Sequence, residues 1–89
     1  MSEIEPYFEL GAEFDEWYSD RPPHIREMVA LCPPNYAYRM ASTGQIVHIL
    51  AYSEDRTVRV MIMQGHNIAT EVFGVSIDDL SKARLEEVR

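Results

Sequence analysis

The sequence has little that would fix it covalently or hold it in a membrane. Cys32 is the only cysteine among 89 residues, which excludes an intramolecular disulfide and a cysteine-rich zinc site. No stretch approaches the roughly 20 apolar residues of a transmembrane helix. The acidic start of the chain also lacks the positive and apolar regions of a secretion signal. We therefore expect a protein of the reducing cytoplasm, outside the membrane.

Basic residues are scarce as well. Eight Lys and Arg stand against fifteen Asp and Glu, a formal net charge of −7. Because binding to a phosphate backbone depends on clustered cations, we do not expect direct nucleic-acid binding. The four glycines are isolated, so no phosphate-binding loop is present. With 46% hydrophobic and 26% charged residues, the chain has the composition of one globular domain.

The negative charge is concentrated in residues 1–20, which hold seven of the acids and no Lys or Arg. The remaining 69 residues carry eight acids and eight bases and are neutral. Large apolar side chains alternate with the acids of residues 1–20, and their spacing predicts a helix from about Pro6 to Tyr18. A strand-like period of two over residues 4–14 fits the same side chains, so both alternatives stay open.

A second helix is predicted with sharper bounds. Ile25, Met28, Val29 and Cys32 recur at the spacing of one helical face. Proline pairs stand on both sides of this stripe, and a residue that precedes proline is disfavoured in a helix. We therefore expect a helix within residues 23–32, from about Pro23 to Leu31.

From residue 36 onward the pattern is typical of β-structure. Four strands are expected between short polar turns, namely Tyr36–Met40, Ile46–Tyr52, Thr57–Met63 and Ile68–Val75. Residues 76–80 form one helical turn opened by Ser76, and residues 81–89 form either a fifth strand or a helix. In the turn at residues 53–56, Arg56 is expected in the left-handed region, where glycine is the usual occupant.

This order of elements resembles that of SH3-like small β-barrels of the Tudor or KOW kind. The resemblance covers about residues 36–88. It rests on Ser53-Glu54-Asp55-Arg56-Thr57-Val58 at a hairpin turn and on Val75-Ser76-Ile77-Asp78-Asp79-Leu80 before a last short strand. It implies a four- to five-stranded antiparallel barrel, and together with the preceding helical segments the chain is expected to form one α+β domain. Such barrels host many activities, so the resemblance implies a fold and no function.

The two longest strands are apolar on both faces. The expected pairs are Tyr52–Val58, Leu50–Val60 and His48–Ile62 on one face, and Ala51–Arg59, Ile49–Met61 and Val47–Met63 on the other. An antiparallel sheet with one solvated face needs only one apolar face. The second face is therefore covered by the helices or by another copy of the chain. The residues predicted for self-association are Val47, Ile49, Met61 and Met63.

Residues that carry catalysis in other proteins are few and scattered here. Cys32 and the histidines at 24, 48 and 66 show neither the spacing of metal ligands nor a local Cys–His pair. We interpret Cys32 as a small buried hydrophobe. Acid pairs such as Asp78-Asp79 lie on segments that look exposed, whereas acid–base catalysis needs a cleft. We expect no catalytic residue, no metal and no cofactor.

An aromatic cage for a cationic side chain is one further hypothesis. Its members would be Tyr36, Tyr38, Tyr52 and Phe73, and an acidic protein would favour a cation there. The same four residues fit the core of a barrel, and this alternative is the simpler one.

The main functional hypothesis concerns residues 1–20. Their aromatic side chains would dock in a partner's groove while the acids steer towards a basic surface. The residues concerned are Phe8, Phe14, Trp17 and Tyr18 with Glu9, Glu13 and Glu16. The alternative is a helix that packs these aromatics on the chain's own barrel and leaves the acids in water.

We therefore expect a non-enzymatic interaction domain that binds a protein partner, itself, or both. A first alternative is an acidic inhibitor that masks a basic, nucleic-acid-binding surface of a partner. A second is a small thiol- or metal-dependent enzyme that uses Cys32 or the histidines.

Overall fold

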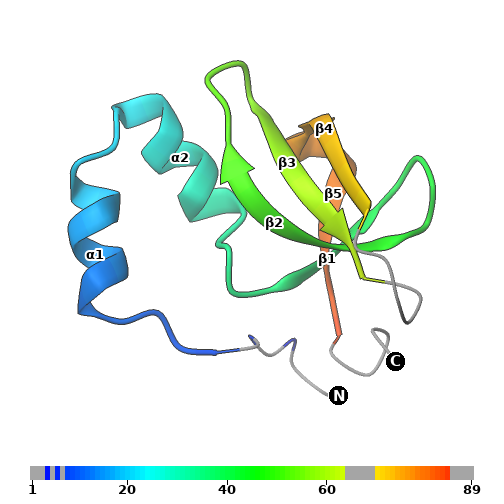
Figure 1. The fold of residues 1–89 in the computed structure, drawn as a ribbon, viewed down its shortest axis with the longest axis horizontal. Helices are drawn as coiled ribbons and strands as arrows, with labels where there is room; N and C mark the ends of the chain where they lie inside the picture. Colours follow the sequence, from blue (N-terminus) through cyan, green and yellow to red (C-terminus); the bar gives the residue numbers. More distant parts are fainter. Residues whose placement is uncertain (1–3, 5, 7, 64–69, 85–89) are drawn as a thin grey trace.

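The computed structural model describes residues 4, 6, 8–63 and 70–84 of the chain. Its elements are α1 (Ala12–Ser19), α2 (Pro23–Leu31), β1 (Ala37–Met40), β2 (Ile46–Tyr52), β3 (Thr57–Ile62), β4 (Thr70–Ser76), a 3₁₀ turn η1 (Ile77–Asp79) and β5 (Leu80–Ala83). The predicted α+β class is confirmed, because two helices precede a five-stranded antiparallel sheet of order β4-β3-β2-β1-β5 (Figure 1). No helix in the described ranges is long and apolar enough to cross a membrane.

The bounds of α2 match the prediction, whereas α1 starts later than predicted. Gly11 caps α1 in an extended conformation, with φ −105° and ψ −169°. The first helical bond runs from the Asp15 amide to the Gly11 carbonyl over 3.1 Å. The helix therefore begins at Ala12 rather than near Pro6, and the strand alternative is wrong for the residues from Ala12 onward.

The strands lie close to their predicted positions. The bounds of β2 are those expected, while β1 begins one residue later and β3 ends one residue earlier. β4 continues to Ser76, and its predicted start at Ile68 lies outside the described residues. Of the two alternatives for residues 81–89, a strand is present as far as Ala83.

α2 covers one face of the sheet with the predicted apolar stripe. Ile25, Met28, Val29 and Cys32 join a single buried cluster with side chains from the strands and η1. Figure 1 shows both helices on the same side of the strands. The predicted helical stripe is therefore the side of α2 that closes the core.

Two tyrosine hydroxyls attach the end of α2 to the sheet. The Tyr38 hydroxyl of β1 donates to the Pro33 carbonyl over 2.6 Å, and the Tyr52 hydroxyl of β2 donates to the Cys32 carbonyl over 2.5 Å. Carbonyls at a helix end lack partners within the helix, and these two bonds satisfy carbonyls directly after α2. Burial raises the pKa of both phenols well above its usual range.

A β-bulge in β2 changes the predicted register of the central hairpin. The pairs Tyr52–Val58 and Ala51–Arg59 are confirmed, but the next pair is Ile49–Val60, so Leu50 is an extra residue. From there to the end of the hairpin the predicted register is wrong by one residue, and Val47 pairs with Ile62. A single extra residue reverses which side chains face the core.

The bulge removes the apparent excess of apolar surface. It turns Val47 and Ile49 onto the core face, where both are buried beside Val58 and Val60. Met61 pairs with His48 on the other face. Met63 packs there against a small second cluster of Ala37, Ile46 and Ala83. Val47, Ile49, Met61 and Met63 therefore do not form one exposed surface, which corrects the prediction that they share a face.

A second bulge lies in β4, on the opposite side of β3. Val58 pairs with Val75 and Val60 with Val72, so β4 has one extra residue opposite Arg59. Gly74 in this bulge has a φ of +71°, which glycine adopts without strain. The bulge keeps Val72 and Val75 packed on the core, while Phe73 is 68% exposed.

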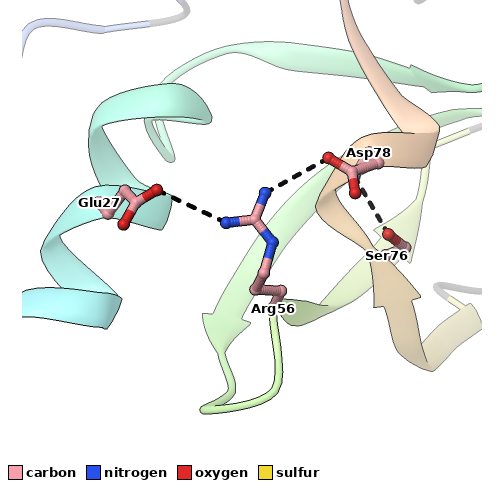
Figure 2. A network of polar contacts seen from close by, with 4 residues as sticks. All are labelled: Glu27, Arg56, Ser76 and Asp78. Atoms are coloured by element: carbon pink, nitrogen blue, oxygen red, sulfur yellow. Dashed lines mark hydrogen bonds and ion pairs between the residues drawn. The ribbon is translucent and has the colours of Figure 1, made fainter.

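Arg56 has the left-handed conformation that the turn pattern predicted, with φ 63°. Figure 2 shows its guanidinium between Glu27 of α2 and Asp78 of η1, at nitrogen–oxygen distances of 3.6 and 3.4 Å. The Asp78 amide donates to the Ser76 hydroxyl, which opens η1 as expected. The β2–β3 turn is thus linked to α2 and to η1.

Candidate functional site

The aromatic residues of α1 point in two directions. Phe14 and Tyr18 are half-buried and pack against the core. The Tyr18 hydroxyl approaches the Arg26 carbonyl of α2 at 3.4 Å. Trp17 faces β2 instead, and its ring centroid lies 6.4 Å from that of Tyr52. Phe14 and Tyr18 therefore attach the helix, while Trp17 remains available at the surface.

The segment before α1 is held through its backbone. The Asn35 side-chain amide donates to the Phe8 carbonyl over 2.8 Å, across 27 positions of sequence. Asn35 is itself buried, whereas the Phe8 side chain is 51% exposed. The predicted binding acids Glu9, Glu13 and Glu16 are all exposed.

An apolar groove lies between α1 and β2. It has a volume of about 400 Å³ and is lined by Phe14, Trp17, Pro34, Leu50, Ala51 and Tyr52. Trp17 and Leu50 are 38% and 37% exposed, which is high for side chains of their size. We call this feature the α1–β2 groove.

The groove depends on features that are distant in the sequence. α1 supplies Phe14 and Trp17, whose ring centroids are 5.6 Å apart. The linker after α2 supplies Pro34, and the β2 bulge turns Leu50 away from the core. Trp17 and Phe14 were predicted as binding residues, whereas Leu50 and Pro34 were not. Residues 46–52 are apolar except for His48, so the sequence of β2 alone gave no signal for the bulge.

Carboxylates share the Trp17 face of α1, although none of them lines the groove itself. Glu13 precedes Trp17 by four residues and Asp20 follows it by three, so both lie on the same helical face as the indole. No ion pair to an α1 carboxylate is found in the described part of the chain. The Arg21 guanidinium lies 5.1 Å from the centre of the Trp17 ring, and its Nε donates to the Trp17 carbonyl.

A smaller hollow lies on the other side of α1, against α2. Its volume is about 210 Å³, and its lining includes Asp15, Tyr18, Val29 and Pro33. Asp15 thus faces α2, while Glu13 and Asp20 lie on the Trp17 face. The carboxylates of this helix are therefore divided between its two sides.

A larger hollow of about 560 Å³ lies between β4 and the turn after β1. The carboxylates on its wall already have partners. Asp79 accepts bonds from the Ser42 amide and hydroxyl, and Asp78 pairs with Arg56. Its apolar lining includes Met40 and Val75, which belong to the core. We interpret this hollow as an open side of the sheet whose carboxylates are already engaged in contacts within the chain.

The thiol and imidazole groups do not converge. Cys32 is buried, and desolvation raises the pKa of its thiol. His48 is half-buried in β2, where desolvation lowers the pKa of its imidazole. His24 is exposed, and His66 lies outside the described residues. The described ranges contain no group of three His, Cys, Asp or Glu side chains placed to hold a metal ion.

Three of the four aromatics of the hypothetical cage, Tyr36, Tyr38 and Tyr52, belong to the core cluster, as the simpler alternative held, while Phe73 is exposed on β4. Tyr38 is buried in the core, and Tyr52 lines the α1–β2 groove. Tyr36 lies beneath the Lys82 ammonium, 4.0 Å from the ring centre. Phe73 pairs with the Arg59 guanidinium at 5.6 Å.

Comparisons of the chain with protein-family models, with curated proteins and with solved structures found no match.

Proposed function

We propose that this protein is a small, non-enzymatic interaction domain that binds a segment of another protein in the α1–β2 groove. The observation that carries this proposal is the exposure of Trp17 and Leu50 on opposite walls of one apolar hollow. Exposed apolar side chains around a concave surface mark binding sites more often than isolated ones do. Trp and Tyr, both present here, are also over-represented among residues that dominate binding energy.

The scaffold we propose is an SH3-like small barrel of the Tudor or KOW kind, acting in the cytoplasm. The strand order and the 3₁₀ turn between β4 and β5 support this scaffold. A lone cysteine that is buried and reduced supports the compartment. Neither argument defines the activity, which rests on the groove.

The substitution Leu50→Glu tests the groove. It places a carboxylate on the apolar wall at a position that already projects from the sheet, so we expect the fold to persist. Peptides selected from a random phage-displayed library on the immobilised full-length chain serve as probes. Their affinity, measured by fluorescence anisotropy, should fall about tenfold or more, as expected for a central anchor contact.

Leu31→Glu is the matched control. It makes the same chemical change at a 56% exposed leucine, the last residue of α2, which does not line the groove. Affinity for the selected peptides should be retained. Equal binding of these peptides to wild type and Leu50→Glu would contradict the proposal, as would a selection that yields no peptide.

The acidic inhibitor is a second candidate, favoured by the carboxylates of α1, which form no ion pair with another described residue. Such an inhibitor presents charge and needs no groove, so Leu50→Glu would leave its binding unchanged. Raising salt from about 50 to 500 mM would instead abolish the binding, because exposed charges are screened. A cationic nucleic-acid-binding domain of known structure is a suitable probe. Loss of its binding in Leu50→Glu would count against the inhibitor.

A further inference from the structure

Building on the proposed function, we infer that the segment bound in the α1–β2 groove is cationic. It carries one bulky apolar side chain that fills the hollow, with Lys or Arg a few residues away. The apolar part follows from the groove lining, and the charge follows from the carboxylates beside it.

The Trp17 face of α1 carries acidic side chains together with one guanidinium, that of Arg21. Glu13 and Asp20 lie on the Trp17 face of the helix, and no ion pair to either is found among the described residues. Residues 1–20 hold seven acids and no Lys or Arg. An approaching Lys or Arg would therefore find exposed carboxylates beside the hollow, and the summed field would increase its rate of association.

Arg21 shows that this wall accepts a guanidinium. Its charged group lies over the Trp17 ring, an arrangement favoured by the electron-rich face of the indole. The Arg21 Nε is held by the Trp17 carbonyl at 3.0 Å, and Arg21 forms no ion pair with an α1 carboxylate in the described ranges. The nearest cation of the chain therefore leaves Glu13 and Asp20 open to a partner's cation.

The same charges argue against a second copy of the chain as the occupant. A symmetric dimer through this groove would place two acidic α1 helices against each other. An acidic partner segment would meet the same repulsion, which gives the groove selectivity against the wrong partner. A basic segment of a different protein is the occupant that the charge pattern favours.

The test compares carboxylates on the two sides of α1. The probes are peptides enriched on the wild-type chain and depleted by counter-selection on Leu50→Glu. We expect them to carry Lys or Arg close to a large apolar residue. Glu13→Gln and Asp20→Asn should each weaken their binding by roughly two- to fivefold, as expected for exposed charge pairs.

Asp15→Asn is the matched control, because it removes the same charge from the same helix on the side that faces α2. At about 0.15 M salt, where exposed charges more than roughly 8 Å apart are largely screened, it should weaken the affinity less than Glu13→Gln does. Added salt should weaken wild-type binding more than Glu13→Gln binding.

The outcomes separate the two proposals. If the enriched peptides depend on Leu50 but show no basic preference, or if Glu13→Gln and Asp15→Asn behave alike, the inference of a cationic segment is wrong and the groove remains a binding site. If peptides with basic residues bind regardless of Leu50, the groove is not the site and both proposals fail. A counter-selection that leaves no groove-dependent peptide overturns both as well.

Discussion

Arg56 has an unfavourable backbone conformation, and its guanidinium lies between two carboxylates. An L-residue in the left-handed region loses roughly 1–2 kcal/mol relative to the right-handed one, and Arg56 has φ 63°. Its ion pairs to Glu27 and Asp78 lie between side chains that are all about half exposed or more, and exposed pairs contribute roughly 0–1 kcal/mol each. The contacts in Figure 2 therefore offset the strain only in part.

Two substitutions at Arg56 separate strain from charge. Arg56→Ala removes both ion pairs and keeps the β-carbon, whereas Arg56→Gly also relieves the strained φ. We expect Arg56→Gly to be more stable than Arg56→Ala by about 1 kcal/mol in urea unfolding. Equal stability of the two variants would show that the turn carries no strain. Asp78→Asn serves as a control that weakens one ion pair without changing the turn residue.

The conformations of some single residues were predictable because the residues next to them in the sequence determine those conformations. The turn length fixed the left-handed place of Arg56, and Ser76 opened η1 as expected for a helix-capping hydroxyl. Leu50 was not predictable in the same way, since nothing in its own side chain marks a bulge. Its position is decided by β3, whose Val58, Val60 and Ile62 require partners on the same face.

At the scale of elements, α2 was predictable and α1 only in part. The bounds of α2 follow from local sequence, because proline pairs stand at both ends of its apolar stripe. α1 has no fully buried residue and no side-chain cap, so its start depends on the conformation of Gly11. The groove was not predicted, because it depends on how separate elements pack together. It forms between elements, and only Phe14 and Trp17 belong to the segment that drew attention.

The attachment of α1 can be measured by comparing two phenylalanines. Phe14→Ala removes a half-buried ring from the core surface, and we expect a loss of about 2 kcal/mol in the free energy of unfolding. Phe8→Ala, in the same acidic segment, removes a side chain that is about half exposed, and it should cost less than Phe14→Ala does, under about 1 kcal/mol. Similar losses in both variants would mean that α1 is not held through Phe14.

At the scale of the whole molecule, the two buried phenols predict a loss of stability in alkali. Burial raises the pKa of Tyr38 and Tyr52 in the folded state above the ordinary value of about 10. Their contribution to the free energy of unfolding is fully present below about pH 10. It falls at higher pH, because there the unfolded chain releases the phenol protons while the folded chain keeps them. The buried Cys32 thiol, whose pKa is also raised, adds to the decline.

Urea midpoints measured from about pH 8 to pH 11 check this expectation. The midpoint should fall above about pH 10 in wild type, and part of the tyrosinate absorbance should appear only on unfolding. Tyr52→Phe should show a shallower fall, at the cost of the bond to Cys32. A pH profile identical to that of wild type would contradict a role for the Tyr52 phenol.

The bulges of β2 and β4 both lie opposite the stretch Arg59–Val60, on the two sides of β3. The bulge in β2 does two things at once, because it turns Val47 and Ile49 into the core and Leu50 out to the groove. The length of β2 is therefore linked to the groove that we propose as a binding site. A related chain with one residue fewer between Gly44 and Ser53 would keep a similar composition and lose the wall of the groove. Counting residues in that interval would separate relatives that share this surface from those that share only the fold.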